Sequence, residues 1–155
     1  MTPGINVVRK HKIAHRVHED SHDSSNRSYG HEAVEKLGVP EARVFKTLVV
    51  SLDGKELAVS VIPVSSLLSL KLIAKAFGAK KATMAAKSDV ERSTGYVLGG
   101  VSPLGQKNRL RTIIDISASH HSSVFVSAGR RGLEIELNPD DLKNLVNGVF
   151  AGVCQ

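Results

Sequence analysis

Short apolar runs separated by polar turns occupy most of the chain and predict a mixture of strands and helices. Two of these runs, residues 45–52 and 57–64, are rich in β-branched residues and flank Asp53-Gly54, a pair that favours a tight turn. They therefore predict a long β-hairpin. Shorter runs of similar character predict further strands at residues 14–18, 112–116, 123–127 and 133–137.

Helices are predicted where apolar residues recur at helical spacing beside capping residues. Thr2-Pro3 is typical of an N-cap followed by proline at the first helical position, and Asn138-Pro139 repeats this arrangement later in the chain. Two such helices therefore lie near the two ends of the sequence. The other predicted helices cover residues 31–37, 70–77 and 87–93, and residues 22–29 are predicted to form a polar loop.

The order of these elements is mixed, with strands concentrated in the second half of the chain. No internal repeat, low-complexity segment or linker divides the 155 residues. We therefore expect one domain, residues 1–155, of the α+β class. Its expected architecture is a mixed, largely antiparallel sheet or β-barrel flanked by helices.

The composition is that of an ordinary soluble protein, with 41% hydrophobic and 23% charged residues. No apolar run approaches the roughly 18 residues that a transmembrane helix needs, and the first residues lack the pattern of a signal peptide. One cysteine, Cys154, excludes an internal disulfide and fits a reducing compartment. We expect a cytoplasmic protein that does not associate with membranes.

The net charge of +6 is concentrated in one third of the sequence. Residues 79–131 carry nine lysines and arginines against three acidic residues, and the rest of the chain is balanced. Cations gathered on one surface bind a polyanion by releasing its counterions, so a phosphate-bearing partner such as nucleic acid is one explanation. A solvated basic face without a partner is the other.

Histidine and cysteine give no convincing catalytic or metal site. His18 and His22 are four residues apart, but the segment is predicted to be a strand that runs into a polar loop, with no cysteine or carboxylate cluster beside it. Cys154 lies at the chain end, where a fixed base and a fixed geometry are rarely available. We expect no metal and no cofactor, and no Ser-His or Cys-His catalytic pair.

Two other features remain open on the sequence alone. Residues 95–105 form a glycine-rich loop that either lets the backbone approach a ligand or serves only as a bulge and turn. Lys46 enters an apolar strand, either as an edge residue that reaches solvent or as an ammonium held in a pocket, where it could anchor an anion or a developing oxyanion.

Three segments of the chain resemble the YbaK family. They are VFKTLVV at residues 44–50, STGYVLGGVSPLGQK at residues 93–107 and VSAGRRGLEIE at residues 126–136. The opening Met1-Thr2-Pro3 and the predicted helix over residues 32–37 also match, so the resemblance covers essentially the whole chain. This family comprises freestanding Cys-tRNA(Pro) deacylases related to the editing domain inserted in bacterial prolyl-tRNA synthetases, and it implies a compact mixed β-barrel flanked by helices.

The resemblance assigns roles to individual positions. Lys46 matches the family's essential lysine, and Gly99 and Ser127 match positions that border the bound aminoacyl group. Glu134 stands where cysteine-specific members usually have aspartate, and Asp20 stands where they usually have tyrosine. The substrate-binding candidates are Asp20, Tyr96, Gly99, Gly100, Ser127 and Glu134, and the tRNA-binding candidates are Lys80, Lys81, Lys107, Arg109, Arg130 and Arg131.

The function that the resemblance implies is hydrolytic removal of cysteine from mischarged Cys-tRNA(Pro). Because the sequence offers no protein nucleophile, the substrate's own thiol is expected to attack its carbonyl, although attack by water stays open. The expected partners are aminoacylated tRNA(Pro) and prolyl-tRNA synthetase. Two alternatives remain: a deacylase for another misacylated tRNA such as Ala-tRNA(Pro), and a tRNA- or synthetase-binding module without catalysis.

Overall fold

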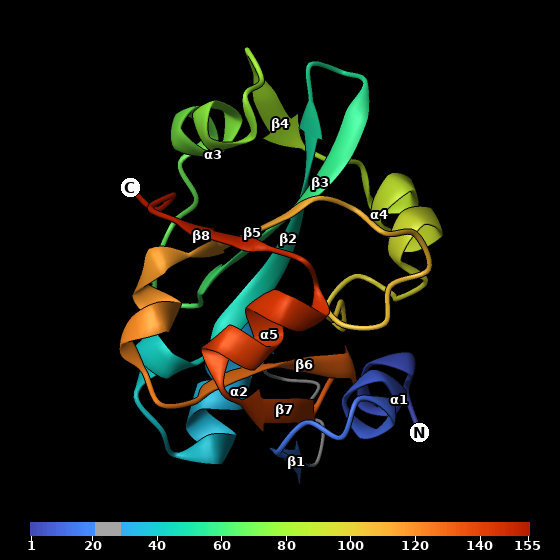
Figure 1. Ribbon diagram of the computed structural model, residues 1–155, viewed down its shortest axis with the longest axis vertical. Helices are drawn as coiled ribbons and strands as arrows, with labels where there is room; N and C mark the ends of the chain where they lie inside the picture. Colours follow the sequence, from blue (N-terminus) through green and yellow to red (C-terminus); the bar gives the residue numbers. More distant parts are fainter. Residues whose placement is uncertain (21–28) are drawn as a thin grey trace.

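The computed structural model describes residues 1–20 and 29–155, and its strands form two sheets (Figure 1). One sheet contains β1 (His15–Glu19), β7 (Leu133–Leu137) and β6 (Val124–Arg130), in that order, with antiparallel pairs throughout. Along β7 the side chains of Leu133, Ile135 and Leu137 are buried, while those between them are half-buried. This alternation is the strand period, and it gives the sheet one core face and one face of mixed polarity.

The second sheet is built on the predicted hairpin. Strands β2 (Phe45–Leu52) and β3 (Glu56–Pro63) pair over their full length, and the turn residues Asp53 and Gly54 both have positive φ angles, 54° and 66°. That conformation suits Asp-Gly and agrees with the sequence. The neighbours are β4 (Ala82–Met84), antiparallel to β2, then β5 (Thr112–Asp115) and β8 (Val149–Ala151), which add in parallel on the β3 side.

The two sheets meet at one isolated bridge between Val44 and Phe125, which aligns the start of β2 in parallel with β6. The mixed, largely antiparallel α+β prediction is therefore confirmed. The barrel that was expected is not closed, because β2 and β6 share this single bridge and no continuous ladder among the described residues.

Within the described residues, five α-helices lie around the sheets (Figure 1). The Thr2 side chain accepts the amide of Ile5 and Asn138 accepts that of Asp140, so both predicted N-caps are present. The third helix ends at residue 77, as predicted, and the Gly78 that follows it takes the left-handed conformation. The helices are α1 (Pro3–Lys10), α2 (Tyr29–Leu37), α3 (Leu70–Phe77), α4 (Lys87–Thr94) and α5 (Pro139–Leu145).

The sequence missed the shortest elements. Strands β4 and β8 have three residues each, too few to show a period. The 3-10 helices at Glu41–Arg43 and Ile116–His120, of three and five residues, are also short. Most of the polar loop predicted at residues 22–29 lies outside the described residues, and Tyr29 already belongs to α2.

The core has two main parts, which lie on opposite faces of β2. Phe45 and Val49 belong to a cluster that includes the buried face of β6 and β7, whereas Val50 and Leu52 pack with Ile73 of α3 on the other face. Consecutive residues of β2 therefore point into different surroundings. A smaller cluster covers the bridge between the sheets and consists of Ala33, Val44, Val64 and Phe125.

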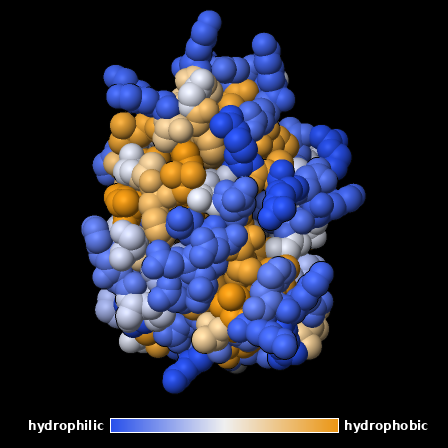
Figure 2. All heavy atoms as spheres, in the orientation of Figure 1, coloured by the Kyte–Doolittle hydropathy of each residue, from blue (hydrophilic) through white to orange (hydrophobic). Residues whose placement is uncertain are grey.

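The surface is mostly polar, with apolar side chains around β8 and the C-terminus on the face shown in Figure 2. Leu67 and Val149 are among the large apolar residues that remain exposed. None of the helices in the described part of the chain is long and apolar enough to cross a bilayer.

Candidate active site

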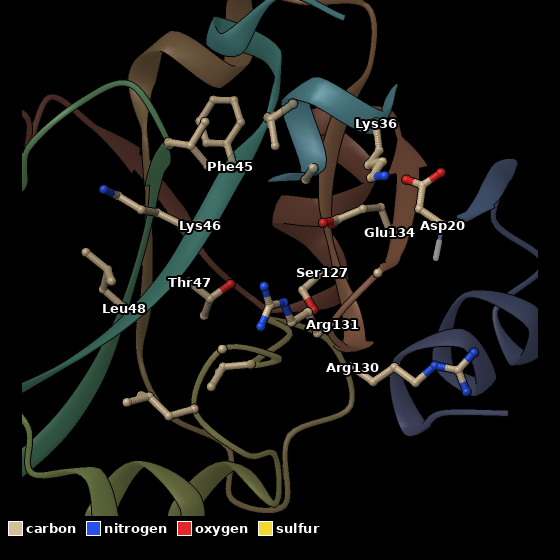
Figure 3. A pocket seen from close by; sticks show the side chains of 17 residues that line it. Asp20, Lys36, Phe45, Lys46, Thr47, Leu48, Ser127, Arg130, Arg131 and Glu134 are labelled. Atoms are coloured by element: carbon tan, nitrogen blue, oxygen red, sulfur yellow. The ribbon is translucent and has the colours of Figure 1, made fainter. Parts of the chain in front are cut away.

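A cavity of about 480 Å³ opens where β2 and β6 separate beyond the bridge at Val44 and Phe125. Its walls come from the first half of β2, the β6–β7 turn region, α2 and the glycine-rich loop (Figure 3). Apolar and polar side chains both contribute. The lining residues are Asp20, Ala33, Lys36, Val44, Phe45, Lys46, Thr47, Leu48, Val64, Leu98, Gly99, Val101, Ser127, Arg130, Arg131, Gly132 and Glu134.

Strand β2 meets the cavity with its open edge. Its partner β4 pairs only with Val50, Ser51 and Leu52, so the stretch from Phe45 to Leu48 has β3 on one side and the cavity on the other. All four consecutive residues therefore line the cavity, although side chains along a strand alternate between its faces.

The opposite wall is fixed by the ladder between β6 and β7. Ser127 and Glu134 are directly opposite each other in the register, which brings their side chains together on one face. The ladder is then interrupted between Ser127 and Arg130, where Gly129 has a φ angle of 119° and its amide donates to the Ser127 hydroxyl at 3.1 Å. This bulge turns the two arginines that follow toward the rim of the cavity.

Glu134 is a buried carboxyl group whose pKa is raised well above its usual value. Its Oε2 atom is closed to solvent and has no hydrogen-bond partner in the described part of the chain. Burial, with a smaller contribution from the Asp20 carboxylate, raises the pKa of Glu134 to about 8. The side chain is therefore largely protonated at neutral pH, and it projects into the cavity (Figure 3).

Glu136, two residues further along β7, is a useful contrast. Its carboxylate accepts the Ser123 hydroxyl at 2.6 Å and pairs with His18 at 3.0 Å and Arg43 at 3.3 Å. Burial acts against its ionisation, but these partners hold its pKa below the usual value. Burial opposes the ionisation of both carboxyls, and the pKa of Glu134 is raised because no such described partners offset its burial.

Asp20 lies at the cavity and not in open solvent. It follows β1, is half-buried, and is held by its own amide, which donates to the Gly132 carbonyl at 2.7 Å. Figure 3 shows its carboxylate on the same side of the cavity as Glu134 and Lys36. The position where the resemblance implies tyrosine thus carries a charge beside the acid on β7.

Lys46 lines the cavity from the other side of β2. It alternates with Thr47, and Figure 3 shows its ammonium directed away from Glu134 and Ser127. The side chain is half-buried and makes no hydrogen bond or ion pair within the described residues, where its charge acts on the Cys154 thiol. Lys46 is therefore both an edge residue and a cavity residue, with a charge free to bind an anion.

Two of the predicted substrate-binding residues do not line the cavity. Tyr96 is buried, donates to the Leu104 carbonyl at 2.6 Å, and packs so closely on Gly129 that a Cβ there would lie 2.6 Å from its ring. Gly100 touches the β6–β7 turn, because a Cβ on it would come within 2.9 Å of the Arg130 Cα. Both therefore support the walls, whereas Gly99 lines the cavity as expected.

Of the six predicted tRNA-binding cations, two line the cavity and four do not. Arg130 and Arg131 line the cavity, and Arg130 also pairs with Glu19 at 2.9 Å. The other four lie outside the cavity lining. Lys80 and Lys81 share a hollow with α3 residues, Arg109 shares another hollow with Phe77, and Lys107 is bonded through its amide to Thr94.

Cys154 remains outside the cavity, as its position at the chain end suggested. Burial and the nearby Asp115 carboxylate raise the pKa of its thiol to about 11, so the thiol is protonated at neutral pH. Among the described residues that line the cavity there is neither histidine nor cysteine. Protein nucleophiles activated by a histidine are therefore absent from these walls.

Sequence reasoning missed two polar side chains of the cavity, besides its apolar lining. Thr47 has a buried hydroxyl without a partner among the described residues, and Lys36 reaches the cavity from α2. A signal for Thr47 was present, since it interrupts an otherwise apolar strand immediately after Lys46. Nothing in the pattern of α2 distinguishes Lys36 from an ordinary exposed lysine.

Comparison with known proteins identifies the family. Residues 26–145 match the family described as the aminoacyl-tRNA editing domain. The chain belongs to this family. The chain is 38% identical over 152 residues to EbsC, a curated protein of Enterococcus faecalis named as a candidate Cys-tRNA(Pro)/Cys-tRNA(Cys) deacylase. The match spans 98% of this chain and 92% of EbsC.

Other similar proteins agree on the editing-domain fold. The uncharacterized protein YwhH of Bacillus subtilis is 30% identical over 125 residues, which are 80% of this chain and 79% of YwhH. A crystal structure described as a candidate trans-editing enzyme for prolyl-tRNA synthetase superposes with a TM-score of 0.84, at 21% identity over 100% of this chain and 99% of that one. A hypothetical protein gives 0.88, at 24% identity over 99% of both chains.

Glu134→Gln should change the pH dependence of stability. Because the pKa of Glu134 is about 8 in the fold and near 4.5 when unfolded, the folded state holds the extra proton between these values. Wild-type stability is then lost as pH rises through that range, on the order of 2–4 kcal/mol for this group. Urea unfolding at pH 5, 7 and 9 should show a smaller loss in Glu134→Gln.

Glu136→Gln is the matched control for that measurement. The pKa of Glu136 is lowered in the fold, so its contribution is present above the unfolded pKa and is lost on acidification. Its removal should therefore reduce stability most at pH 7 and 9. Parallel pH profiles for the wild type and Glu134→Gln would show that Glu134 is not protonated in the fold.

Proposed function

We propose that this protein hydrolyses the ester of misacylated tRNA, with Cys-tRNA(Pro) as its main substrate, and that it acts in the cytoplasm as one domain. The observation that carries this proposal is a cavity with unpartnered polar atoms on two facing walls but no histidine or cysteine among its described lining residues. An aminoacyl ester is already activated, so such a site needs only to orient it and stabilise charge. The family and the relationship to EbsC support the same class of substrate.

The missing nucleophile points to the substrate itself. The cysteinyl thiol, after losing its proton, forms a bond from sulfur to the ester carbonyl carbon. The ester C–O bond then breaks, and the ribose oxygen leaves with a proton. The cyclic thioester opens in water afterwards, so that the net reaction is hydrolysis.

Each wall has a role in this proposal. The unpaired ammonium of Lys46 binds the terminal phosphate or ribose oxygens of the tRNA, at the mouth of the cavity. The carboxyl groups of Glu134 and Asp20 receive the substrate's α-ammonium, whose positive charge favours ionisation of Glu134. Gly99 allows the backbone to approach the aminoacyl group. Selection of tRNA(Pro) is left to prolyl-tRNA synthetase, because the domain is small.

A deacylation panel tests the proposal directly. Purified protein is incubated with Cys-, Ala-, Ser- and Pro-charged proline tRNA, and with Cys-tRNA(Pro) whose sulfur is blocked. Rapid loss of cysteine, abolished by the blocking group, is the expected result. Binding of tRNA without release of any amino acid would instead identify a non-catalytic binding module.

Lys46→Ala should reduce deacylation by at least about 100-fold while the fold persists, because the lost ammonium anchors the tRNA end in the productive position. The measurement is the single-turnover rate on Cys-tRNA(Pro), with circular dichroism to establish folding. Cys154→Ser is the control, because the Cys154 thiol is within the electrostatic reach of Lys46 but is protonated and lies outside the cavity. Near wild-type rates in folded Lys46→Ala would exclude this role.

Asp20→Tyr should narrow the range of amino acids that are removed. The aromatic ring would close the side of the cavity where the Asp20 carboxylate now lies, and a single pocket contact is worth roughly 1–3 kcal/mol. We expect the ratio of Cys to Ala deacylation to rise by about 10- to 100-fold. The same ratio of Cys to Ala deacylation in the wild type and in Asp20→Tyr would mean that this position does not select the amino acid.

Charge reversal at Lys107 and Arg109 should weaken tRNA binding without slowing deacylation of the tRNA that is bound. Both side chains are exposed and lie outside the cavity, where they would meet phosphates beyond the 3′ end. The double change to glutamate should raise KM at low salt, with kcat retained, and flatten the salt dependence. Reversal of Lys10 and Lys12, exposed residues of α1 and its end, is the control with equal charge change.

A further inference from the structure

The Thr47 hydroxyl is a buried polar group to which the roles above give no function. Its Oγ1 atom is closed to solvent and lacks a hydrogen-bond partner in the described part of the chain, yet the residue lines the cavity. Buried hydroxyls are normally satisfied, so an unsatisfied one that faces a cavity indicates a group supplied by a ligand. Glu134 Oε2 is the corresponding atom on the facing wall.

The backbone of Thr47 adds a second donor at the same place. Val44 accepts the amide of Val64, and in an antiparallel ladder every second residue bonds the same neighbour. Residues 46 and 48 therefore bond β3, while Thr47 directs its N–H and C=O to the open edge. Val49 follows the same phase, since its carbonyl accepts the amide of Ala85 on that edge.

At Thr47 this edge has no strand beside it. Strand β4 ends its pairing at Val50, and no backbone partner of the Thr47 amide exists among the described residues. One residue thus brings an amide and a hydroxyl to the same wall of the cavity. Figure 3 shows the Arg131 guanidinium on the other side, directed toward Thr47.

Two converging donors near a cation suit an oxygen that gains negative charge. The acidic side of the cavity, at Glu134 and Asp20, suits the α-ammonium instead. An aminoacyl ester has these two groups on adjacent carbons, the carbonyl carbon and the α-carbon. A substrate whose ammonium lies toward the acids therefore places its carbonyl oxygen toward the opposite wall, where Thr47 lies.

We propose that Thr47 is a catalytic residue, whose backbone N–H and hydroxyl together form an oxyanion hole for the ester carbonyl. This inference rests on the proposed deacylase function and deepens it. As the thiol or water attacks the carbonyl carbon, the C=O electron pair moves onto oxygen, and both donors strengthen. The pair returns when the ester C–O bond breaks, so no proton is exchanged with Thr47.

Thr47→Val and Thr47→Ser test the hydroxyl. Valine keeps the shape and the strand preference but removes one of two donors, and loss of one oxyanion donor slows catalysis by about 100- to 1000-fold. We expect that loss in kcat for Thr47→Val, with KM within about twofold, because the donor acts mainly on the transition state. Thr47→Ser should restore kcat to within about threefold of wild type.

Ser60→Ala is the matched structural control. Ser60 also has a buried hydroxyl without a described partner, but it lies on β3, outside the cavity. Its removal should leave kcat unchanged. Thermal unfolding of all three variants shows whether the fold persists, and a structural role for Thr47 would appear as lost stability with an intact kcat.

The outcomes separate this inference from the function on which it rests. If wild-type protein releases no amino acid from the charged tRNA panel, the proposed function fails and the oxyanion hole with it. If the wild type is active and Thr47→Val keeps its kcat within about threefold, the function stands and the role of Thr47 is wrong. A rise in KM alone would also overturn it, because that effect marks a ground-state contact.

Discussion

The single bridge between Val44 and Phe125 is the contact on which the site depends. It brings the two sheets together at the start of β2. Beyond this bridge, β2 and β6 form no further ladder with each other and separate. Had the barrel closed, β6 would have occupied the edge of Phe45–Leu48 and no cavity would remain there. The small apolar cluster around Ala33, Val64 and the bridge residues keeps this junction dry while the neighbouring edge stays available.

Two polar atoms on facing walls of the cavity, Thr47 Oγ1 and Glu134 Oε2, have no hydrogen-bond partner among the described residues. On β7, Glu136 has three partners, whereas Glu134 on the same face has none for its Oε2. Each of these unsatisfied atoms costs free energy of folding, which a ligand that supplied a partner would restore. Such local costs are typical of binding and catalytic sites.

Much of the fold follows from local signals in the sequence. The Asp53-Gly54 turn, the Thr2 and Asn138 caps and the Gly78 helix end were all predictable, because each depends on neighbouring residues alone. The resemblance to known editing proteins also indicated which segments would meet. Neither source could place Tyr96 in the core or split the basic residues among separate loops, because those outcomes depend on long-range packing.

The β2–β3 hairpin has a further consequence through its length. Lys46 lies near one end of β2, and beyond the other end the Asp53 carboxylate accepts the amides of Lys80 and Lys81. A strand rises about 3.3 Å per residue, so the lysine pair lies about 20 Å from the cavity. The hairpin is thus a spacer of fixed length. A ligand that contacts both Lys46 and the lysine pair must span about 20 Å.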